Sequence, residues 1–215
     1  MSAKAVFIDK DGTLIEDVPY NVDPQRIRLT AGAVRGLQRL QRLGYLLIGV
    51  SNQPGIALGH FTETALDAAV RHLRALLAES SVQLAGFYYC PHDPAGRSRR
   101  YAMHCRCRKP EPGLLFTAAY IHDIDLHQSW LIGDILNDVE AGAHAGCRTV
   151  LLDNGNETEW KRGPFREPSC RARDLAEAAR CIEEIDTLDS MSDKCRPGVR
   201  MMRRVAPNSG GPLRT

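Results

Sequence analysis

Two aspartates in the segment VFIDKDGTL, Asp9 and Asp11, have the residue type and spacing that phosphoryl transfer requires. They follow a short apolar run, and Gly12 and Thr13 can turn the chain so that both carboxylates face one pocket. One aspartate can attack phosphorus to form an acyl phosphate, while a second protonates the leaving oxygen and later activates water. Because an anionic nucleophile and an anionic ester repel each other, this chemistry needs a cation.

A second acidic motif, GDILND, offers ligands for that cation. Asp134 ends another apolar run and, together with Asp9, can bind an oxygen-preferring ion such as Mg²⁺. Asp138 lies one helical turn later and either supports the site or is an acid favoured at a helix start. For either acidic motif taken alone, a turn or a helix cap explains the residues equally well.

The segment 90–107 has the composition of a metal site. Its candidate zinc ligands, a closed set of three sulfurs and one nitrogen that leaves no position for water, are Cys90, His92, Cys105 and Cys107. His104 can compete as a ligand, and the alternative to zinc is a reduced, partly exposed cysteine loop. Arg108 and Lys109 follow directly, so a bound metal would also fix two cations.

The chain has the size and composition of one globular domain, with 215 residues of which 43% are hydrophobic. No signal-like apolar run opens the sequence, and no segment approaches the roughly 20 apolar residues of a membrane span. We therefore expect a cytoplasmic protein that does not enter a membrane. In that compartment the clustering of cysteines favours metal binding over disulfides.

The distribution of charged residues divides the sequence into a long N-terminal part and a basic C-terminal tail. Residues 194–215 hold six Lys or Arg and no acid, which leaves a slight excess of acids in residues 1–193. Because residues 187–215 are rich in Pro, Gly and Ser and lack periodicity, we expect them to be disordered and the folded domain to span 1–186. The basic tail can touch nucleic acid or anionic lipid, but a solvated extension is the simpler interpretation.

Alternating apolar runs and helical patterns predict an α/β fold with a doubly wound parallel sheet. The expected strands are 5–9, 45–50, 84–89, 130–134 and 149–152, and the clearest helices are 62–79, 112–122, 136–145 and 172–186. Ligands of such sheets bind outside the carboxyl ends of the strands, near the point where strand order reverses. Asp9, Ser51 and Asp134 stand at these ends.

The order DxDGT, Ser after an apolar run, Lys-Pro and GDxxxD resembles the haloacid dehalogenase superfamily of phosphohydrolases. The resemblance implies a Rossmann-like core in which Asp9 is the nucleophile and a magnesium ligand. It also implies that Asp11 is the general acid and base, with its backbone carbonyl on the ion, and that Asp134 binds magnesium. Ser51 and Lys109 would hold the transferring phosphoryl oxygens.

The zinc loop followed by CRKP, and the segment SNQPGIALGHFT, resemble the D-glycero-D-manno-heptose 1,7-bisphosphate phosphatase family over about residues 5–152. This resemblance implies a Mg²⁺-dependent, zinc-containing enzyme that removes the 7-phosphate of the heptose bisphosphate on the way to lipopolysaccharide. Histidinol-phosphate phosphatase shares these motifs and is the enzymatic alternative. Neither 14–50 nor 52–108 is long enough for a full cap domain, so loops must shape the pocket. In this family Asp138 would support the magnesium site or orient Lys109.

The expected contacts to a small sugar phosphate are Asp17, Tyr20, Ser51, Asn52, Gln53, Arg108 and Lys109. Arg108 can form a fork onto a second anion, which suits a bisphosphate. The family usually carries Lys after its magnesium-binding Asp, whereas this chain has Ile135. With Ile135 in place of this Lys, a different sugar phosphate as substrate, or a lower activity, stays an alternative.

A non-enzymatic zinc module that binds nucleic acid is the alternative from another class. It would use Arg97, Arg99, Arg100 and the basic tail. Aromatic residues make up only 6% of the chain and do not alternate with these arginines. We therefore expect no nucleic-acid partner and a monomeric protein.

Overall fold

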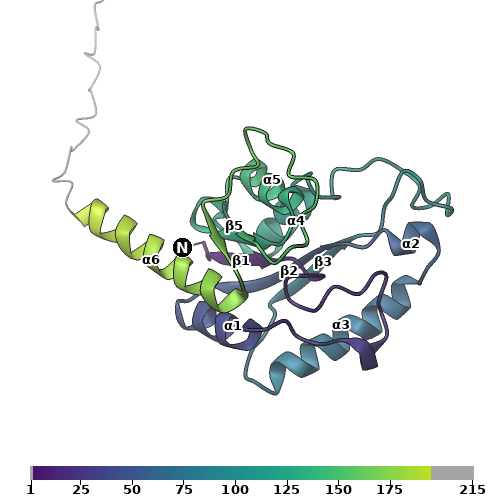
Figure 1. Ribbon diagram of the computed structural model, residues 1–215, viewed down its shortest axis with the longest axis horizontal. Helices are drawn as coiled ribbons and strands as arrows, with labels where there is room; N and C mark the ends of the chain where they lie inside the picture. Colours follow the sequence, from purple (N-terminus) through teal and green to yellow (C-terminus); the bar gives the residue numbers. More distant parts are fainter. Residues whose placement is uncertain (1, 195–215) are drawn as a thin grey trace, which may run out of the picture.

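The computed structural model describes residues 2–194, which form a six-stranded parallel sheet in the order β3-β2-β1-β4-β5-β6, with helices on both faces (Figure 1). The strands are β1 (Ala5–Ile8), β2 (Leu46–Asn52), β3 (Gly86–Cys90), β4 (Trp130–Gly133), β5 (Arg148–Leu152) and β6 (Cys170–Ala172). The α-helices are α1 (Ala33–Arg42), α2 (Gly55–Leu58), α3 (Glu63–Ala78), α4 (Gly113–His122), α5 (Leu136–Ala145) and α6 (Leu175–Lys194). The expected doubly wound parallel sheet is confirmed.

The two central strands, β1 and β4, bury every residue, as expected for strands covered on both faces. They pair in parallel, with Val6 opposite Trp130 and Ile8 opposite Ile132. The chain runs from β1 outward to β3 and then returns to β4 on the other side of β1, so strand order reverses between them. Asp9 and Asp134 each follow the last residue of one of these strands, at the switch point where ligands of this fold bind.

The helices cover the two faces of the sheet in separate groups (Figure 1). On one face, Leu37 and Leu40 of α1 join Leu73 of α3 and Ile182 of α6 in the larger apolar core. On the other, Leu115 of α4 packs in a second core that includes residues of β1 and β2. Within residues 2–194, no helix combines the length and the hydropathy needed to cross a lipid bilayer.

The last helix, α6, extends beyond the boundary expected at residue 186 and continues to Lys194. Its residues 187–192 are exposed, so packing does not explain the extension. The Arg148 guanidinium bridges Asp186 and Asp189, at 2.7 and 2.6 Å, and so ties this turn of the helix to β5. The rest of the predicted basic tail, residues 195–215, lies outside the described residues.

The edge strand β6 was not predicted, because its three residues, Cys170, Arg171 and Ala172, have no apolar run. A disulfide joins Cys170 to Cys181 and thereby links β6 to α6. The sequence predicted no pairing for these two cysteines, which lie outside the clustered loop at 90–107, because only the fold brings them together.

Candidate active site

Three buried carboxylates converge at the switch point of the sheet. Asp9 follows β1, Asp134 follows β4, and Asp138 lies in the first turn of α5. One carboxylate oxygen of each lies within 4.8 Å of those of the other two. Oxygen donors at this spacing fit a hard divalent cation such as Mg²⁺. The structure thus brings together Asp9 and Asp134, as the sequence predicts, and adds the side chain of Asp138.

Lys109 supplies the positive charge inside this cluster. Its Nζ lies 2.5 Å from Oδ1 of Asp9 and 2.6 Å from Oδ1 of Asp138, and it donates to the carbonyl of Val50 at 3.2 Å. Asn52 fixes the lysine backbone, because its side-chain amide donates to the Lys109 carbonyl and accepts from the Lys109 N–H. The ammonium is thus held beside Asp9 from both ends of the residue.

Asp138 combines the two roles that the sequence left open. Its Oδ1 pairs with Lys109, while its Oδ2 accepts from the backbone N–H of Ile135 at 3.4 Å, where α5 begins. The same carboxylate therefore orients the lysine and caps a helix start. Because the side chain is fully buried, it also contributes to the electrostatics of its neighbours.

Burial shifts the pKa values of Asp9, Asp134 and Lys109. Desolvation raises the pKa of Asp9 well above its ordinary value, although the charge of Lys109 opposes this shift. Desolvation and the nearby charge of Asp138 raise the pKa of Asp134 to about 6. For Lys109, desolvation lowers the pKa, but the charges of Asp138 and Asp9 outweigh it and the net shift is upward. Without a bound metal the site therefore keeps Lys109 charged and favours the protonated forms of Asp9 and Asp134.

Asp11 points to a different set of partners. Its Oδ1 pairs with the ammonium of Lys10, and its Oδ2 accepts from Nε2 of Gln53 at 2.9 Å. Gln53 also donates to the hydroxyl of Ser51 at 2.8 Å. Ser51 and Asp11 are thus held by one amide, and the Asp11 carboxylate lies outside the three-aspartate cluster.

These side chains surround a cavity of about 220 Å³ that we call the catalytic cavity. Its lining is Asp9, Asp11, Asp17, Ser51, Asn52, Lys109, Asp134, Ile135, Asp138 and Asn156. Tyr20 and Gln53 line an adjoining cavity of about 140 Å³ that shares Asp11, Asp17 and Asn52 with the first. Every predicted catalytic residue thus lines the catalytic cavity.

Arg108 is the exception among the expected substrate contacts. It lines neither of these cavities. Its guanidinium instead lies 3.2 Å from Oδ2 of Asp93 and donates to the carbonyl of His92 at 3.2 Å. In this conformation Arg108 ties together the loop of residues 90–107 and does not face the catalytic cavity.

Sequence reasoning missed three polar residues that support the aspartates: Lys10, Thr13 and Asn156. Thr13 Oγ1 and Asn156 Nδ2 donate to the two oxygens of Asp134, at 3.3 and 2.7 Å. Lys10 and Thr13 stand inside DKDGT and could have been found there, whereas Asn156 lies in the polar segment after β5, which carries no motif.

Gly12 makes this arrangement possible. Its φ is +77°, a conformation that favours glycine. A Cβ added at this position would lie 2.0 Å from Oδ2 of Asp134 and 2.4 Å from Nδ2 of Asn156. The carboxylate and the amide therefore occupy the space that any other residue would fill.

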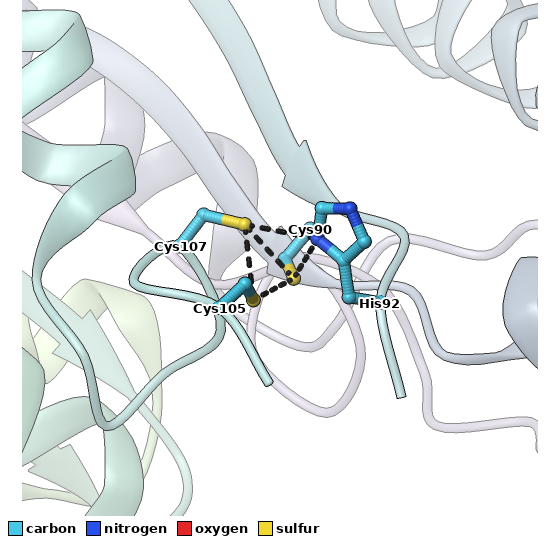
Figure 2. Close-up of side chains that lie close together, drawn as sticks. All are labelled: Cys90, His92, Cys105 and Cys107. Atoms are coloured by element: carbon cyan, nitrogen blue, oxygen red, sulfur yellow. Dashed lines mark hydrogen bonds between the residues drawn. The ribbon is translucent and has the colours of Figure 1, made fainter. Parts of the chain in front are cut away.

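The four candidate zinc ligands form a second cluster, shown in Figure 2. The three sulfur pairs lie 3.2 to 3.5 Å apart, and Nδ1 of His92 lies 3.3 Å from Cys107 Sγ and 3.6 Å from Cys90 Sγ. A tetrahedral zinc site with Zn–S bonds of about 2.3 Å has edges of about 3.8 Å, so the four donors fit such an ion after a small expansion. His104 is exposed and does not belong to the cluster.

Outside the cluster, the loop is anchored on the helices beside it. Tyr101 and Tyr89 both donate to Glu63 at the start of α3, at 2.7 and 3.3 Å. The N–H groups of Arg97 and Ser98 donate to the carbonyl of Ala57 in α2. The loop is thus positioned at both its tip and its base.

A doubly wound sheet with an aspartate after β1 and a lysine-paired acid cluster at its switch point is the arrangement of the haloacid dehalogenase class of hydrolases. Residues 106–178 match the HAD-hydrolase-like family. Over 151 residues, the chain is 38% identical to D-glycero-beta-D-manno-heptose-1,7-bisphosphate 7-phosphatase of Salmonella typhi, covering 70% of this chain and 80% of that protein. It belongs to the heptose-1,7-bisphosphate 7-phosphatase family.

Two further relatives agree with this assignment. The enzyme of the same name from Pasteurella multocida is 40% identical over 153 residues, which cover 71% of this chain and 83% of that protein. The crystal structure of D,D-heptose 1,7-bisphosphate phosphatase from B. bronchiseptica, complexed with magnesium and phosphate, is similar with a TM-score of 0.68 and 28% identity. That likeness covers 85% of this chain and 99% of the other.

Proposed function

We propose that this chain is a Mg²⁺-dependent phosphatase that converts D-glycero-D-manno-heptose 1,7-bisphosphate to heptose 1-phosphate. One observation carries the proposal: in a member of this family, Lys109 contacts both Asp9 and Asp138 at the switch point of the sheet. Family membership supports this function and does not support histidinol phosphate as the substrate or a non-enzymatic nucleic-acid module.

The covalent chemistry falls to the two aspartates of DKDGT. A carboxylate oxygen of Asp9 attacks the 7-phosphorus, and the bond from phosphorus to the sugar oxygen breaks as Asp11 gives that oxygen a proton. Asp11 then takes a proton from water, which attacks the aspartyl phosphate and regenerates Asp9 with release of inorganic phosphate. The Gln53 amide, which holds both Asp11 and Ser51, keeps this acid aimed at the leaving group.

Ser51 and Lys109 bind the phosphoryl oxygens, the first through its hydroxyl and the second through its charge. Lys109 is already beside Asp9 and needs only to exchange part of that contact for a phosphoryl oxygen. Asn52 acts on the reaction through Lys109, whose backbone it clamps.

The Asp9 and Asp134 carboxylates, with the backbone carbonyl of Asp11, would hold Mg²⁺, which when bound neutralises charge on the ester and on the nucleophile. Thr13 and Asn156 keep Asp134 oriented for that role. Cys90, His92, Cys105 and Cys107 would hold a structural Zn²⁺ with no open position. Because Lys109 lies two residues after Cys107, a bound metal that orders the loop 90–107 would also position the phosphate-binding lysine.

The substrate would enter as a small sugar phosphate recognised by loops, with Asp17 and Tyr20 on the flap after β1. Arg108 would have to leave Asp93 to reach the second phosphate. We further propose a monomer that acts in the cytoplasm.

The test is a comparison of phosphate release from heptose 1,7-bisphosphate and histidinol phosphate, each with saturating Mg²⁺. We expect kcat/KM for the bisphosphate to exceed that for histidinol phosphate by at least about a hundredfold. Equal values, or a preference for histidinol phosphate, would overturn the substrate assignment while leaving the phosphatase mechanism in place.

A further inference from the structure

A larger cavity of about 770 Å³ is lined by Leu136 at the start of α5, the residue after Ile135 of the catalytic cavity, and has no role in the chemistry above. We call it the arginine cavity, because Arg162, Arg166 and Arg171 line it together with Trp160 and Leu136. The two cavities share no lining residue. Glu167 is the one acid among the lining residues of this cavity, against three arginines.

The segment 153–169, between β5 and β6, forms most of this cavity and is held against α5. The Arg166 guanidinium donates to Glu140 at 2.7 Å and to Asn137, and His144 packs edge-on against Phe165 at 4.6 Å between ring centres. These contacts hold the loop on α5 and leave open the cavity that Trp160 lines. The cavity is therefore a formed concave surface of the kind that binds small ligands.

Two of the arginines remain available to a ligand. Arg162 makes no hydrogen bond or ion pair among the residues that the structure describes, and it is exposed. Arg171 lies 3.8 Å from Asp153 in a half-exposed pair, which is worth little in water, and its guanidinium lies over the Trp160 ring at 5.3 Å. The indole itself is 43% exposed. Two arginines without a strong ion-pair partner, Arg162 and Arg171, thus lie in one cavity with the exposed ring of Trp160.

Guanidinium groups match phosphate geometry with paired N–H donors, and an indole offers a surface on which a ring can pack. We propose that the arginine cavity is a second binding site, separate from the catalytic one, for a small phosphorylated molecule that places a ring against Trp160. A nucleotide and a sugar phosphate share this chemistry.

The site is also linked to the metal cluster through its own loop. Glu157 accepts from the backbone N–H of Trp160 at 3.2 Å and from that of Leu136 at 2.6 Å, where α5 begins. The next residue back, Asn156, donates to Asp134. A ligand against Trp160 therefore contacts the segment that orients a magnesium ligand, which makes it a candidate regulator.

Binding can be measured on the full chain carrying Asp9→Asn, which cannot turn over an ester. The probes are ADP, mannose 1-phosphate and inorganic phosphate, and the signal is tryptophan fluorescence, because Trp160 is exposed while Trp130 is fully buried. We expect ADP or mannose 1-phosphate to change the emission. Adding Arg162→Ala with Arg171→Ala should weaken that binding at least tenfold. Arg35→Ala with Arg180→Ala, in a separate groove between α1 and α6, is the matched control and should leave the binding unchanged.

Three results would overturn the proposal. The first is no response to any probe. The second is equal binding by the cavity variant and the control, which would move the ligand elsewhere. The third is inorganic phosphate binding as tightly as both esters, which would reduce the site to an adventitious anion site. Because these readouts involve no turnover, they do not depend on the proposed phosphatase activity.

Discussion

Lys109 and Asp9 form a buried ion pair with 2.5 Å between Nζ and Oδ1, although they are 100 residues apart in the chain. The pair joins the end of the cysteine-rich loop at 90–107 to the end of β1. It therefore couples the residue that would bind the phosphoryl group to the residue that would attack it.

We expect Lys109→Met to lower the free energy of unfolding by about 3 kcal/mol in Mg²⁺-free buffer, because it leaves buried carboxylates without their cation. Saturating Mg²⁺ should restore part of the loss by neutralising the same carboxylates. Urea denaturation with and without Mg²⁺ measures both effects. Lys10→Met is the matched control: Asp11, its partner, is partly exposed and keeps its Gln53 contact, so the loss should be clearly smaller.

Replacing the nucleophile should separate activity from folding. Asp9→Asn should reduce phosphate release more than about a hundredfold, since no acyl phosphate can form. The fold should persist, because Lys109 keeps Asp138 as a partner. Phosphate assays and thermal melting together give the result, and a folded variant with a hundredth or more of the wild-type activity would rule out the covalent route.

The raised pKa of Asp134, about 6, predicts a pH-dependent stability in the absence of Mg²⁺. A carboxyl group whose folded pKa is above its unfolded value stabilises the fold at low pH, and this stability is lost as pH rises through about 6. Between pH 4 and 7 the ionisation of Asp134 should lower the free energy of unfolding by about 2 kcal/mol.

Asp134→Asn removes that contribution, so the variant should be more stable than wild type at pH 7 and similar to it at pH 4. Urea denaturation gives the free energy of unfolding of wild type and of Asp134→Asn at each pH. The difference between the two values isolates the contribution of Asp134, because Asp9, Asp138 and Lys109 remain in both proteins. If the free energies of unfolding of the two proteins ran parallel from pH 4 to pH 7, Asp134 would be ionised at low pH in the folded chain.

Loss of one thiolate should remove the zinc and disturb the lysine that follows it. Cys107→Ser should lower zinc content from one per chain toward none and raise KM even in saturating Mg²⁺. Cys147→Ser is the control, because Cys147 is a free, buried cysteine outside the cluster. Elemental analysis of both variants tests this. Zinc-free Cys107→Ser with an unchanged KM would contradict the positioning role.

Ile135 lines the catalytic cavity where the family usually carries Lys. We expect Ile135→Lys to change KM for the heptose bisphosphate more than kcat, because an added ammonium contacts an anion in both the ground and the transition state. Steady-state kinetics measure the split. An unchanged KM would show that the side chain at this position does not face the substrate.

The parallel sheet, five of its six strands and the residues that line the catalytic cavity at the strand ends were within reach of the sequence, because buried parallel strands leave apolar runs and these polar residues follow them directly. β6 and the disulfide partner Cys181 were not, since pairing at a sheet edge depends on tertiary contacts and leaves no local pattern. The side chain of Arg108 was assigned toward substrate from its position beside Lys109. The structure turns it to Asp93, and no spacing rule specifies which of two anions a flexible side chain meets.

The two hydrogen bonds that Thr13 and Asn156 donate to Asp134 could not be predicted from the sequence either. Asn156 reaches this carboxylate from a segment that is 22 residues away and has no periodicity. Long-range hydrogen bonds of this kind are set by how two loops meet, which the sequence of neither loop encodes.

The lack of space for a side chain at Gly12 limits how this protein can evolve. Every single-nucleotide change that replaces this glycine introduces a Cβ against Asp134 and Asn156, at 2.0 and 2.4 Å. A lineage that loses Gly12 must therefore move the Asp134 carboxylate before it can regain activity, whereas at Gly163 an added Cβ would lie 3.5 Å from its nearest neighbour, in Arg166, and has room. Purifying selection should act far more strongly on the first glycine than on the second.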